Sequence, residues 1–258
     1  LETAGITYLH APLFHPAMRH VGPVRKELGF KTFFNLLGPL LNPARVTKQL
    51  AGVYSPAVAE LYAGVLGKAG GSFAIVHSLD GYDEVSLTGE FLLLNGSGSG
   101  THAPDVFGFE ILAPESLTGG ASLDESARML VSILKNRGTP AQTNAVLANA
   151  ALALHAANPA LSLPDALAAA RESLESGRAF RSLEIFAEKL TTSPRRAAGG
   201  GGAGGRPAGF GEATPNPPAG RPPHRLPKPP DGATRKNAEG AEKSILRALR
   251  VFIANYPL

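Results

Sequence analysis

The chain has 258 residues, of which 43% are apolar, enough for one good-sized core or two small ones. It contains no cysteine, so disulfides, thiolate zinc sites and cysteine nucleophiles are excluded. Its net charge of +4 is unevenly distributed: residues 1–192 carry 14 Lys and Arg against 17 Asp and Glu, a net −3, and residues 193–258 carry 11 against 4, a net +7. Residues 1–192 therefore offer no basic surface for nucleic acid.

The cellular setting follows from what the sequence lacks. No apolar run reaches the ~18–20 residues that a membrane span needs. The first residues contain neither an initiator Met nor a signal-peptide pattern. We therefore expect a cytoplasmic location, no membrane partner, and a chain that is the interior of a longer one.

Residues 1–192 are predicted to form an α/β domain. An extended start leads to a short helix with Pro23 in its first turn, and residues 31–45 are predicted to be a buried, irregular loop because they contain Gly38, Pro39 and Pro43. Strands are expected at residues 49–55 and 72–78. The helix between them begins at Ser55-Pro56, and this βαβ spacing favours a parallel pair. The apolar positions of that helix at 3.6-residue spacing are Val58, Leu61, Tyr62, Val65 and Leu66.

The second half of this domain is predicted to hold two antiparallel strands and three helices. The strands are expected at residues 90–96 and 107–114, and the glycine-rich stretch 95–100 is interpreted as flexible loop. A capping box at Thr139 begins a helix that is apolar nearly all round and should be buried. Ser162 begins the next helix, and the last, over residues 178–190, places Leu183, Phe186 and Leu190 on one face.

The composition changes after Thr192. Of residues 193–232, 10 are Gly and 10 are Pro, so we expect residues 193–240 to be a disordered tail that buries too little to offset its ordering entropy. Residues 241–258 could form a short amphipathic helix, which is either a frayed terminus or an element that docks on a membrane surface or partner.

Two adjacent acids, Asp83 and Glu84, follow the strand at residues 72–78 and a glycine turn at Gly81. Ligand sites of α/β sheets lie beyond strand ends, and Mg²⁺ typically binds one or two carboxylates together with substrate phosphates and water. The pair is therefore either a magnesium site, with Asp80 close enough to assist and Ser86 able to hydrogen-bond the pair, or a solvated acidic turn.

Arg25 is the second candidate. In a helix over residues 23–29 it lies at the edge of the apolar stripe, where its guanidinium could bind a substrate carboxylate through two hydrogen bonds; a surface Arg that caps the helix is the alternative. His15, before a proline, fits packing or capping better than general-base catalysis.

Several catalytic signatures are absent. The sequence has no Walker A motif and no G-x-G-x-x-G after a predicted strand. His77, His102 and His155 lack ligand spacing, and no nucleophile–base pair is recognisable. The chemistry either needs no protein nucleophile or has half of its site elsewhere.

Three elements carry a family resemblance: APLFHPAMRHVGPVRKELGFKTFFNLLGPLLNPA, QLAGVYSPAVAELYAGVL and HSLDGYDEVSLTG. In this order they resemble the second half of anthranilate phosphoribosyltransferases, from residue 1 to about residue 191. The resemblance implies a large α/β domain of the nucleoside phosphorylase/phosphoribosyltransferase fold, with a mixed central sheet and closing C-terminal helices.

Members of that family transfer the phosphoribosyl group of phosphoribosyl pyrophosphate (PRPP) to anthranilate, release pyrophosphate, and serve tryptophan biosynthesis. By resemblance, Arg25 holds the anthranilate carboxylate, Pro12 and Met18 line the anthranilate tunnel, and Asp83 and Glu84 bind Mg²⁺ near the pyrophosphate. The anthranilate amine attacks the ribose directly, so no residue is assigned as catalytic.

The chain departs from the family at both ends. The N-terminal helical part, with most PRPP-binding segments and the homodimer contacts, is not in the sequence, so we expect the chain alone to be inactive. We interpret the tail, which has no counterpart in the family, as a read-through or frame-shifted end, with a basic linker as the alternative. Two alternatives remain open: a non-catalytic nucleic-acid-binding relative of the same fold, which the acidic pair and the net −3 disfavour, and a pyrimidine nucleoside phosphorylase-like enzyme, which the NLLGPLLNPA match disfavours.

Overall fold

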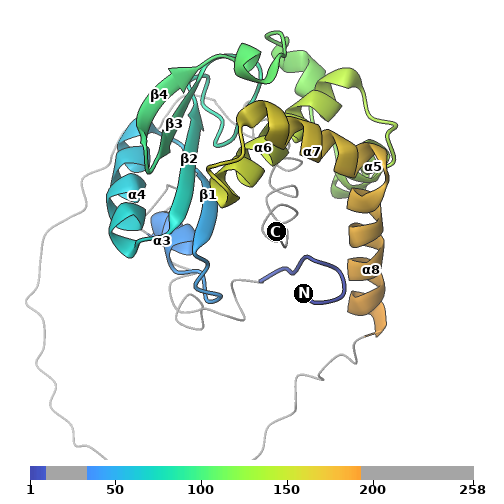
Figure 1. The fold of residues 1–258 in the computed structure, drawn as a ribbon. Helices are drawn as coiled ribbons and strands as arrows, with labels where there is room; N and C mark the ends of the chain where they lie inside the picture. Colours follow the sequence, from blue (N-terminus) through green and yellow to red (C-terminus); the bar gives the residue numbers. More distant parts are fainter. Residues whose placement is uncertain (10–33, 193–258) are drawn as a thin grey trace, which may run out of the picture.

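The computed structural model describes residues 1–9 and 34–192, in which a four-stranded sheet lies between two layers of helices (Figure 1). The strand order is β1-β2-β3-β4, with β1 and β2 parallel and the other neighbours antiparallel. The sheet is thus mixed, and the predicted fold class is confirmed. The strands span β1 Lys48–Gly52, β2 Ser72–Ser78, β3 Phe91–Asn95 and β4 Gly98–His102.

Strand β2 separates the two halves of the core. Its side chains alternate: Phe73 and Ile75 pack with helix α4 (Pro56–Ala69), whereas Ala74 and Val76 pack with helix α6 (Pro140–Ala157) on the opposite face. Because both faces are covered, the strand reads as a continuous apolar run instead of an alternating one. The short helix α3 (Phe34–Leu40) joins the α4 layer, and α7 (Leu163–Glu175) joins the α6 layer.

The helix starts follow the predicted capping residues. The Ser55 hydroxyl accepts a hydrogen bond from the Val58 N–H at 3.4 Å and begins α4. Thr139 and Gln142 form the expected capping box of α6, with bonds of 3.2 and 3.0 Å. Each cap satisfies N–H groups that have no partner inside the helix. Helix α6 buries nine residues, which confirms the prediction that it lies in the core.

Two helices flank this body. Helix α5 (Leu123–Leu134) was not predicted; it begins at the N-cap Ser122 and buries Ile133 and Leu134 at its end. Helix α8 (Arg178–Thr192) extends away from the other helices in Figure 1. Of its predicted apolar face, Leu183 packs against the core, but Leu190 is 65% exposed, so only the first half of that face is covered.

Three predictions of secondary structure were wrong. The segment read as an irregular loop contains α3, because Leu36 and Leu40 pack on the α4 cluster and the Tyr62 hydroxyl donates to the Leu36 carbonyl at 2.7 Å. The glycine-rich stretch 95–100 forms a β3–β4 hairpin, in which the Ser97 N–H donates to the Asn95 side chain at 2.8 Å. Residues 107–114 form no strand: Phe107, Phe109 and Leu112 pack into the core from an irregular segment, and Ile111 is exposed.

The apolar positions that predicted helix α4 are buried only in part. Val58 and Tyr62 are buried, but Leu61 and Val65 are 49% and 43% exposed. Ala59, which is fully buried, takes their place against the sheet, since a small side chain permits close packing of helix on strand. The predicted helix around Arg25 and the predicted tail, residues 193–258, lie outside the described residues.

None of the helices in the described ranges is long and apolar enough to cross a membrane.

Candidate functional site

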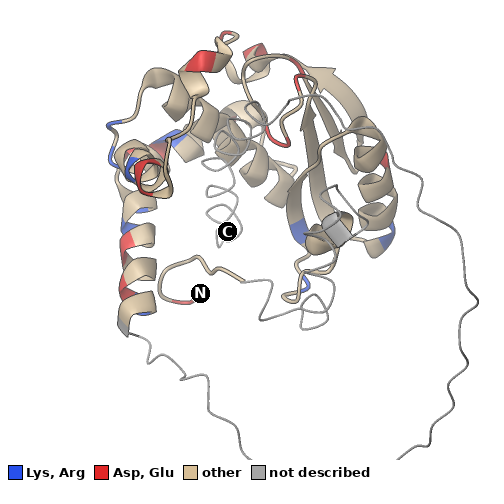
Figure 2. Ribbon diagram, turned by 180° about the vertical axis from the view of Figure 1, so that it is seen from behind, with Lys and Arg blue, Asp and Glu red and all other residues tan. Residues whose placement is uncertain are grey.

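The acidic pair lies on the loop that joins β2 to β3, residues 79–90. The ends of β1 and β2 and the start of β3 share one edge of the sheet, and β4 finishes there, because Ser78 pairs with Phe91 and Phe91 with His102. Figure 2 shows an acidic segment in the loop beside this edge. Asp83 and Glu84 therefore occupy the position beyond a strand end at which α/β sheets bind ligands.

A tight turn leads from β2 into this loop. The Gly81 N–H donates to the Ser78 carbonyl at 2.9 Å, and Gly81 has a φ of 100°, which favours glycine. The Ser78 N–H donates to the Tyr82 carbonyl at 2.9 Å, and the Leu79 N–H donates to the Glu90 carbonyl at 2.8 Å. These bonds close the base of the loop and set the direction in which the acidic pair leaves the sheet.

Asp80 binds the part of the loop that follows the acidic pair. Its carboxylate accepts hydrogen bonds from the Ser86 hydroxyl at 3.2 and 3.3 Å and from the Thr88 hydroxyl. Asp80 and Ser86 were expected to assist the acidic pair directly. The structure instead joins them to each other, so that they hold together the two ends of the segment that carries Asp83 and Glu84.

The two acids differ in their surroundings. Glu84 is only 4% exposed, whereas Asp83 is half-buried. Val85 and Leu87, which follow them, are fully buried in the cluster around α6. The pair thus sits where the loop passes from the surface into the core.

Leu87 also has an unusual backbone. Its φ of 62° places a bulky residue in the left-handed region, a strained conformation that persists only where the surroundings enforce it. Here the side chain is fully buried, and the Leu87 carbonyl accepts the Leu112 N–H at 2.8 Å. Strain of this kind concentrates at functional sites, which agrees with the position of the acidic pair.

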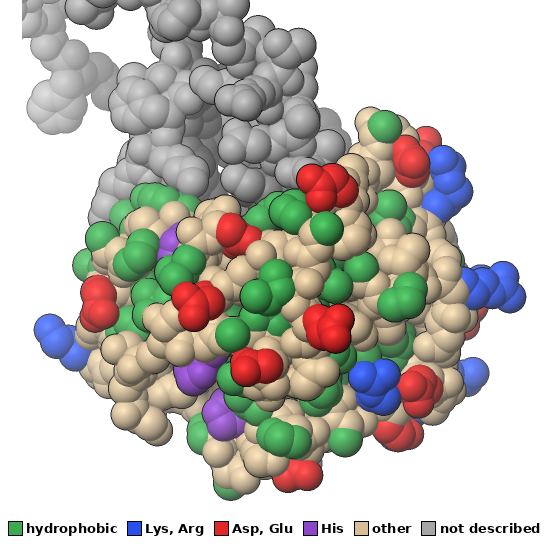
Figure 3. Space-filling model, turned by 90° about the horizontal axis from the view of Figure 1, so that it is seen from above, with side chains coloured by type: hydrophobic (Ala, Val, Ile, Leu, Met, Phe, Trp, Pro, Cys, Tyr) green, Lys and Arg blue, Asp and Glu red, His purple; other side chains and the backbone are tan. Residues whose placement is uncertain are grey.

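The two carboxylates of Asp83 and Glu84 suit Mg²⁺ better than a metal ion that takes all of its ligands from protein side chains. No cluster of three or more His, Cys, Asp or Glu side chains that could hold a metal ion occurs within residues 1–9 and 34–192. Two neighbouring carboxylates match an ion that takes its other ligands from water and substrate phosphates. Viewed onto this edge, acidic side chains are spread over the face and Lys and Arg lie mainly toward its sides (Figure 3). Such a face repels a phosphorylated ligand unless a cation lies between them.

The three histidines among the described residues, His77, His102 and His155, have separate structural roles. The His77 ring nitrogen Nδ1 lies 3.0 Å from the Val53 carbonyl, and that of His155 lies 2.7 Å from the Leu161 carbonyl. The His102 ring packs on Phe91 with centroids 5.7 Å apart. They form no metal cluster within the part of the chain that the structure describes.

The predicted anthranilate residues Pro12, Met18 and Arg25, together with His15, lie outside the described residues.

Two residues that hold the acidic loop were missed by the sequence reading: Ser78 at the end of β2 and Asn149 within α6, both buried. Asn149 carried a signal, since it is a polar side chain in the middle of a helix that is otherwise almost entirely apolar, and such a residue needs a hydrogen-bonding partner. The sequence did not show that this partner is the backbone beside Glu84.

Known proteins resemble this chain over the same region. The family described as "Glycosyl transferase family, a/b domain" matches residues 1–180. Among curated relatives, anthranilate phosphoribosyltransferase of Cytophaga hutchinsonii is 47% identical over 180 residues, which cover 70% of this chain and 55% of the relative. The chain thus spans just over half the length of this relative, and the resemblance read from the sequence motifs is confirmed.

Solved structures agree with this match. Anthranilate phosphoribosyltransferase from Thermus thermophilus superposes with a TM-score of 0.68 and 38% identity, over 73% of this chain and 57% of that one. The Saccharomyces cerevisiae enzyme in complex with PRPP and Mg gives a TM-score of 0.66 at 32% identity, over 72% of this chain and 53% of that one. The yeast enzyme is also known in complex with 4-fluoroanthranilate.

Proposed function

The chain belongs to the glycosyl transferase family whose α/β domain it matches. We propose that it is the α/β part of an anthranilate phosphoribosyltransferase. The enzyme joins the amino nitrogen of anthranilate to C1 of the ribose of PRPP and releases pyrophosphate, a step of tryptophan biosynthesis. The observation that supports the proposal is the position of the acidic pair, on a hydrogen-bonded loop beyond the end of β2, where α/β sheets generally bind ligands.

Asp83 and Glu84 would hold Mg²⁺ together with phosphate oxygens of PRPP. When bound, the ion neutralises the negative charge that develops on the leaving pyrophosphate. The yeast relative solved with PRPP and Mg supports this assignment by similarity.

Arg25 would bind the anthranilate carboxylate, with Pro12 and Met18 as apolar walls of the same pocket. A guanidinium suits this task because its two parallel N–H groups match a carboxylate and fix the plane of the ring. Because the substrate amine is itself the nucleophile, positioning the two substrates accounts for much of the rate enhancement. This explains why no protein nucleophile was recognised in the sequence.

The anthranilate site can be tested on the 258-residue chain with 4-fluoroanthranilate, whose fluorine signal in NMR broadens and shifts even on weak binding. We expect Arg25→Ala to weaken binding at least ten-fold, because a hydrogen-bonded charge pair contributes about 1.5–3 kcal/mol. Lys26→Ala, which removes the neighbouring positive charge, serves as the matched control and should bind like the wild type. Equal binding by both variants would refute the role of Arg25.

Three further properties belong to the proposal for the whole enzyme. The chain spans just over half of its relatives, so its homodimeric state, its cytoplasmic location and its dependence on the remaining half of the PRPP site are predictions. We expect PRPP and anthranilate, and no nucleic acid, as its partners, because residues 1–192 carry a net charge of −3.

A further inference from the structure

Asn149 is a buried polar residue with an unusual set of bonds. It lies in the middle of α6, is 7% exposed, and its neighbours along the helix are mainly Ala and Leu. Its amide nitrogen donates to the Val85 carbonyl at 2.8 Å and to the Ala145 carbonyl of its own helix at 2.9 Å, and its amide oxygen accepts the Val85 N–H at 3.0 Å. One side chain therefore binds both backbone polar groups of the residue that follows Glu84.

Ser78 completes these contacts from the opposite side. Its hydroxyl donates to the Glu84 carbonyl at 2.5 Å and accepts the Ser86 N–H at 3.2 Å. The peptide group between Glu84 and Val85 thus has its N–H bound by Asn149 and its carbonyl bound by Ser78. The next peptide group has its carbonyl bound by Asn149 and its N–H bound by Ser78.

Two consecutive peptide groups are therefore held on both sides by two buried side chains, one from a helix and one from a strand. We call this arrangement the Asn149–Ser78 clamp. A peptide plane whose N–H and carbonyl are both bound cannot rotate without losing a buried hydrogen bond, and the low dielectric of the core makes that loss costly. The clamp consequently fixes the direction in which the Glu84 side chain leaves the backbone.

We propose that Asn149 is a positioning residue for the acidic pair: through the backbone of Val85 it orients Glu84, and with it Asp83, for metal binding. This inference rests on the proposed function, in which the two carboxylates hold Mg²⁺. Helix α6 has the most buried residues of the helices in the described chain. Its bonds therefore fix the loop relative to the core, which hydrogen bonds within the loop cannot do. Outer groups that orient metal ligands typically change metal affinity about 10–100-fold when they are removed.

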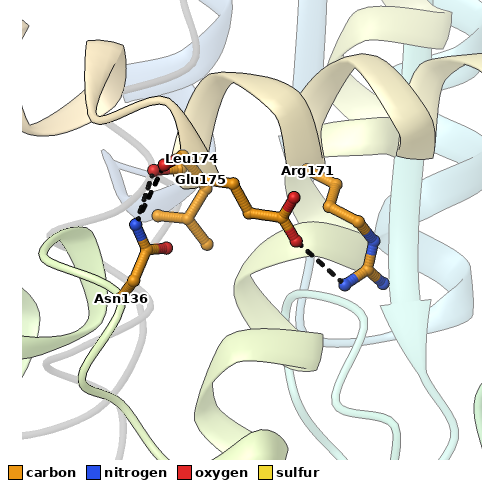
Figure 4. Close-up of polar contacts among 4 residues, drawn as sticks. All are labelled: Asn136, Arg171, Leu174 and Glu175. Carbon is orange, nitrogen blue, oxygen red and sulfur yellow. Dashed lines mark hydrogen bonds and ion pairs between the residues drawn. The ribbon is translucent and has the colours of Figure 1, made fainter.

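The test compares Asn149→Ala and Asn149→Leu with Asn136→Ala in the full 258-residue chain. The leucine variant retains most of the side-chain volume but neither donor nor acceptor, so it separates the lost bonds from a cavity. Asn136 is a matched control, because its amide nitrogen also donates to backbone carbonyls of another element, those of Leu174 and Glu175 at 3.1 and 3.4 Å (Figure 4). Those carbonyls lie at the end of α7, beside the Arg171–Glu175 ion pair, and not in the acidic loop.

Two readouts are needed. Amide hydrogen exchange measures whether residues 83–87 open more readily, relative to the amides of β2, which report opening of the whole domain. Binding of Mn²⁺ alone, followed by electron paramagnetic resonance, measures the carboxylate pair, because Mn²⁺ favours the same oxygen ligands as Mg²⁺. For both Asn149 variants we expect loop exchange at least ten-fold faster than in the wild type and Mn²⁺ affinity about 10–100-fold weaker, with Asn136→Ala unchanged in both.

The outcomes separate this inference from the proposed function. If the Asn149 variants fold and their loop exchanges like the wild type, or if Mn²⁺ affinity is unchanged although the loop opens, Asn149 does not position the pair. If loop exchange and Mn²⁺ affinity change equally in Asn136→Ala, the effect is one of general stability and the inference is again wrong. If Mn²⁺ binding by the wild type does not depend on Asp83 and Glu84, the metal site of the proposed function is wrong. Faster loop exchange in the Asn149 variants would then show only that Asn149 stabilises the loop, and the positioning role would be overturned.

Discussion

Replacing Ser78 by alanine should destabilise the protein far more than loss of one hydroxyl normally does. Ser78 is fully buried, and its oxygen serves both the Glu84 carbonyl and the Ser86 N–H. In Ser78→Ala both backbone groups lose this partner in the core, and each buried group left unsatisfied costs about 1–3 kcal/mol. We therefore expect the free energy of unfolding to fall by about 2–6 kcal/mol, a large part of the ~5–15 kcal/mol typical of a domain.

Urea unfolding followed by circular dichroism measures this loss. With a dependence of about 2 kcal/mol per molar urea, the middle of the usual range, the midpoint should fall by roughly 1–3 M. Ser116→Ala is the matched control, because the Ser116 hydroxyl donates to the Ala113 carbonyl at 2.6 Å but the residue is exposed; its stability should stay within about 0.5 kcal/mol of the wild type. If Ser78→Ala loses no more stability than Ser116→Ala, the Asn149–Ser78 clamp does not hold the loop as described.

Three further predictions concern the sheet, a helix cap and activity. Gly71→Ala should destabilise the protein by about 1–3 kcal/mol, because an added Cβ would lie 2.5 Å from the Thr47 carbonyl oxygen. Gly64→Ala, where an added Cβ has no atom within 4 Å, should stabilise α4 by up to ~1 kcal/mol. Thermal melts compare the two variants, and equal shifts in melting temperature would contradict the packing at Gly71. Thr139→Ala should cost about 1 kcal/mol by the same measurement, since it removes the α6 cap, and an unchanged melting temperature would show that the cap contributes nothing. The 258-residue chain alone should not convert anthranilate in the presence of PRPP and Mg²⁺, because it spans just over half of the length of its relatives. The fluorescence of anthranilate should therefore stay constant, and a measurable decrease would refute this expectation.

The local signals in the sequence predicted the parts of the fold that depend on local chemistry. Caps at Ser55, Thr139 and Ser162 begin helices in the structure because each supplies an oxygen to free N–H groups of the first turn. The parallel pair of β1 and β2 followed from the length of the helix between them.

The errors arose where tertiary contacts decided the structure. Helix α3 contains Pro39 and forms because its leucines pack against α4, which no local pattern indicates. The alternating apolar residues of 107–114 resemble a strand, but Phe109 and Leu112 pack against the helical core. Strand β4 has almost no apolar side chains and is ordered by pairing with β3.

The candidate site shows the same division. The motif around Asp83 and Glu84 was recognisable because the residues are adjacent in sequence and follow a strand. The contact of Asn149 with Val85 joins residues 64 positions apart, so a single sequence could indicate a buried amide but not its partner.

The most direct test of the account is a titration of the chain with Mn²⁺ followed by broadening of backbone amide signals in NMR, because the paramagnetic ion broadens only nearby signals. We expect broadening centred on residues 81–86 in the wild type, its loss in the Asp83→Asn/Glu84→Gln variant, and its retention in Glu184→Gln, which removes an exposed acid on α8. Broadening that persists at the loop without the two carboxylates, or that never appears there, would contradict a magnesium site at this edge of the sheet.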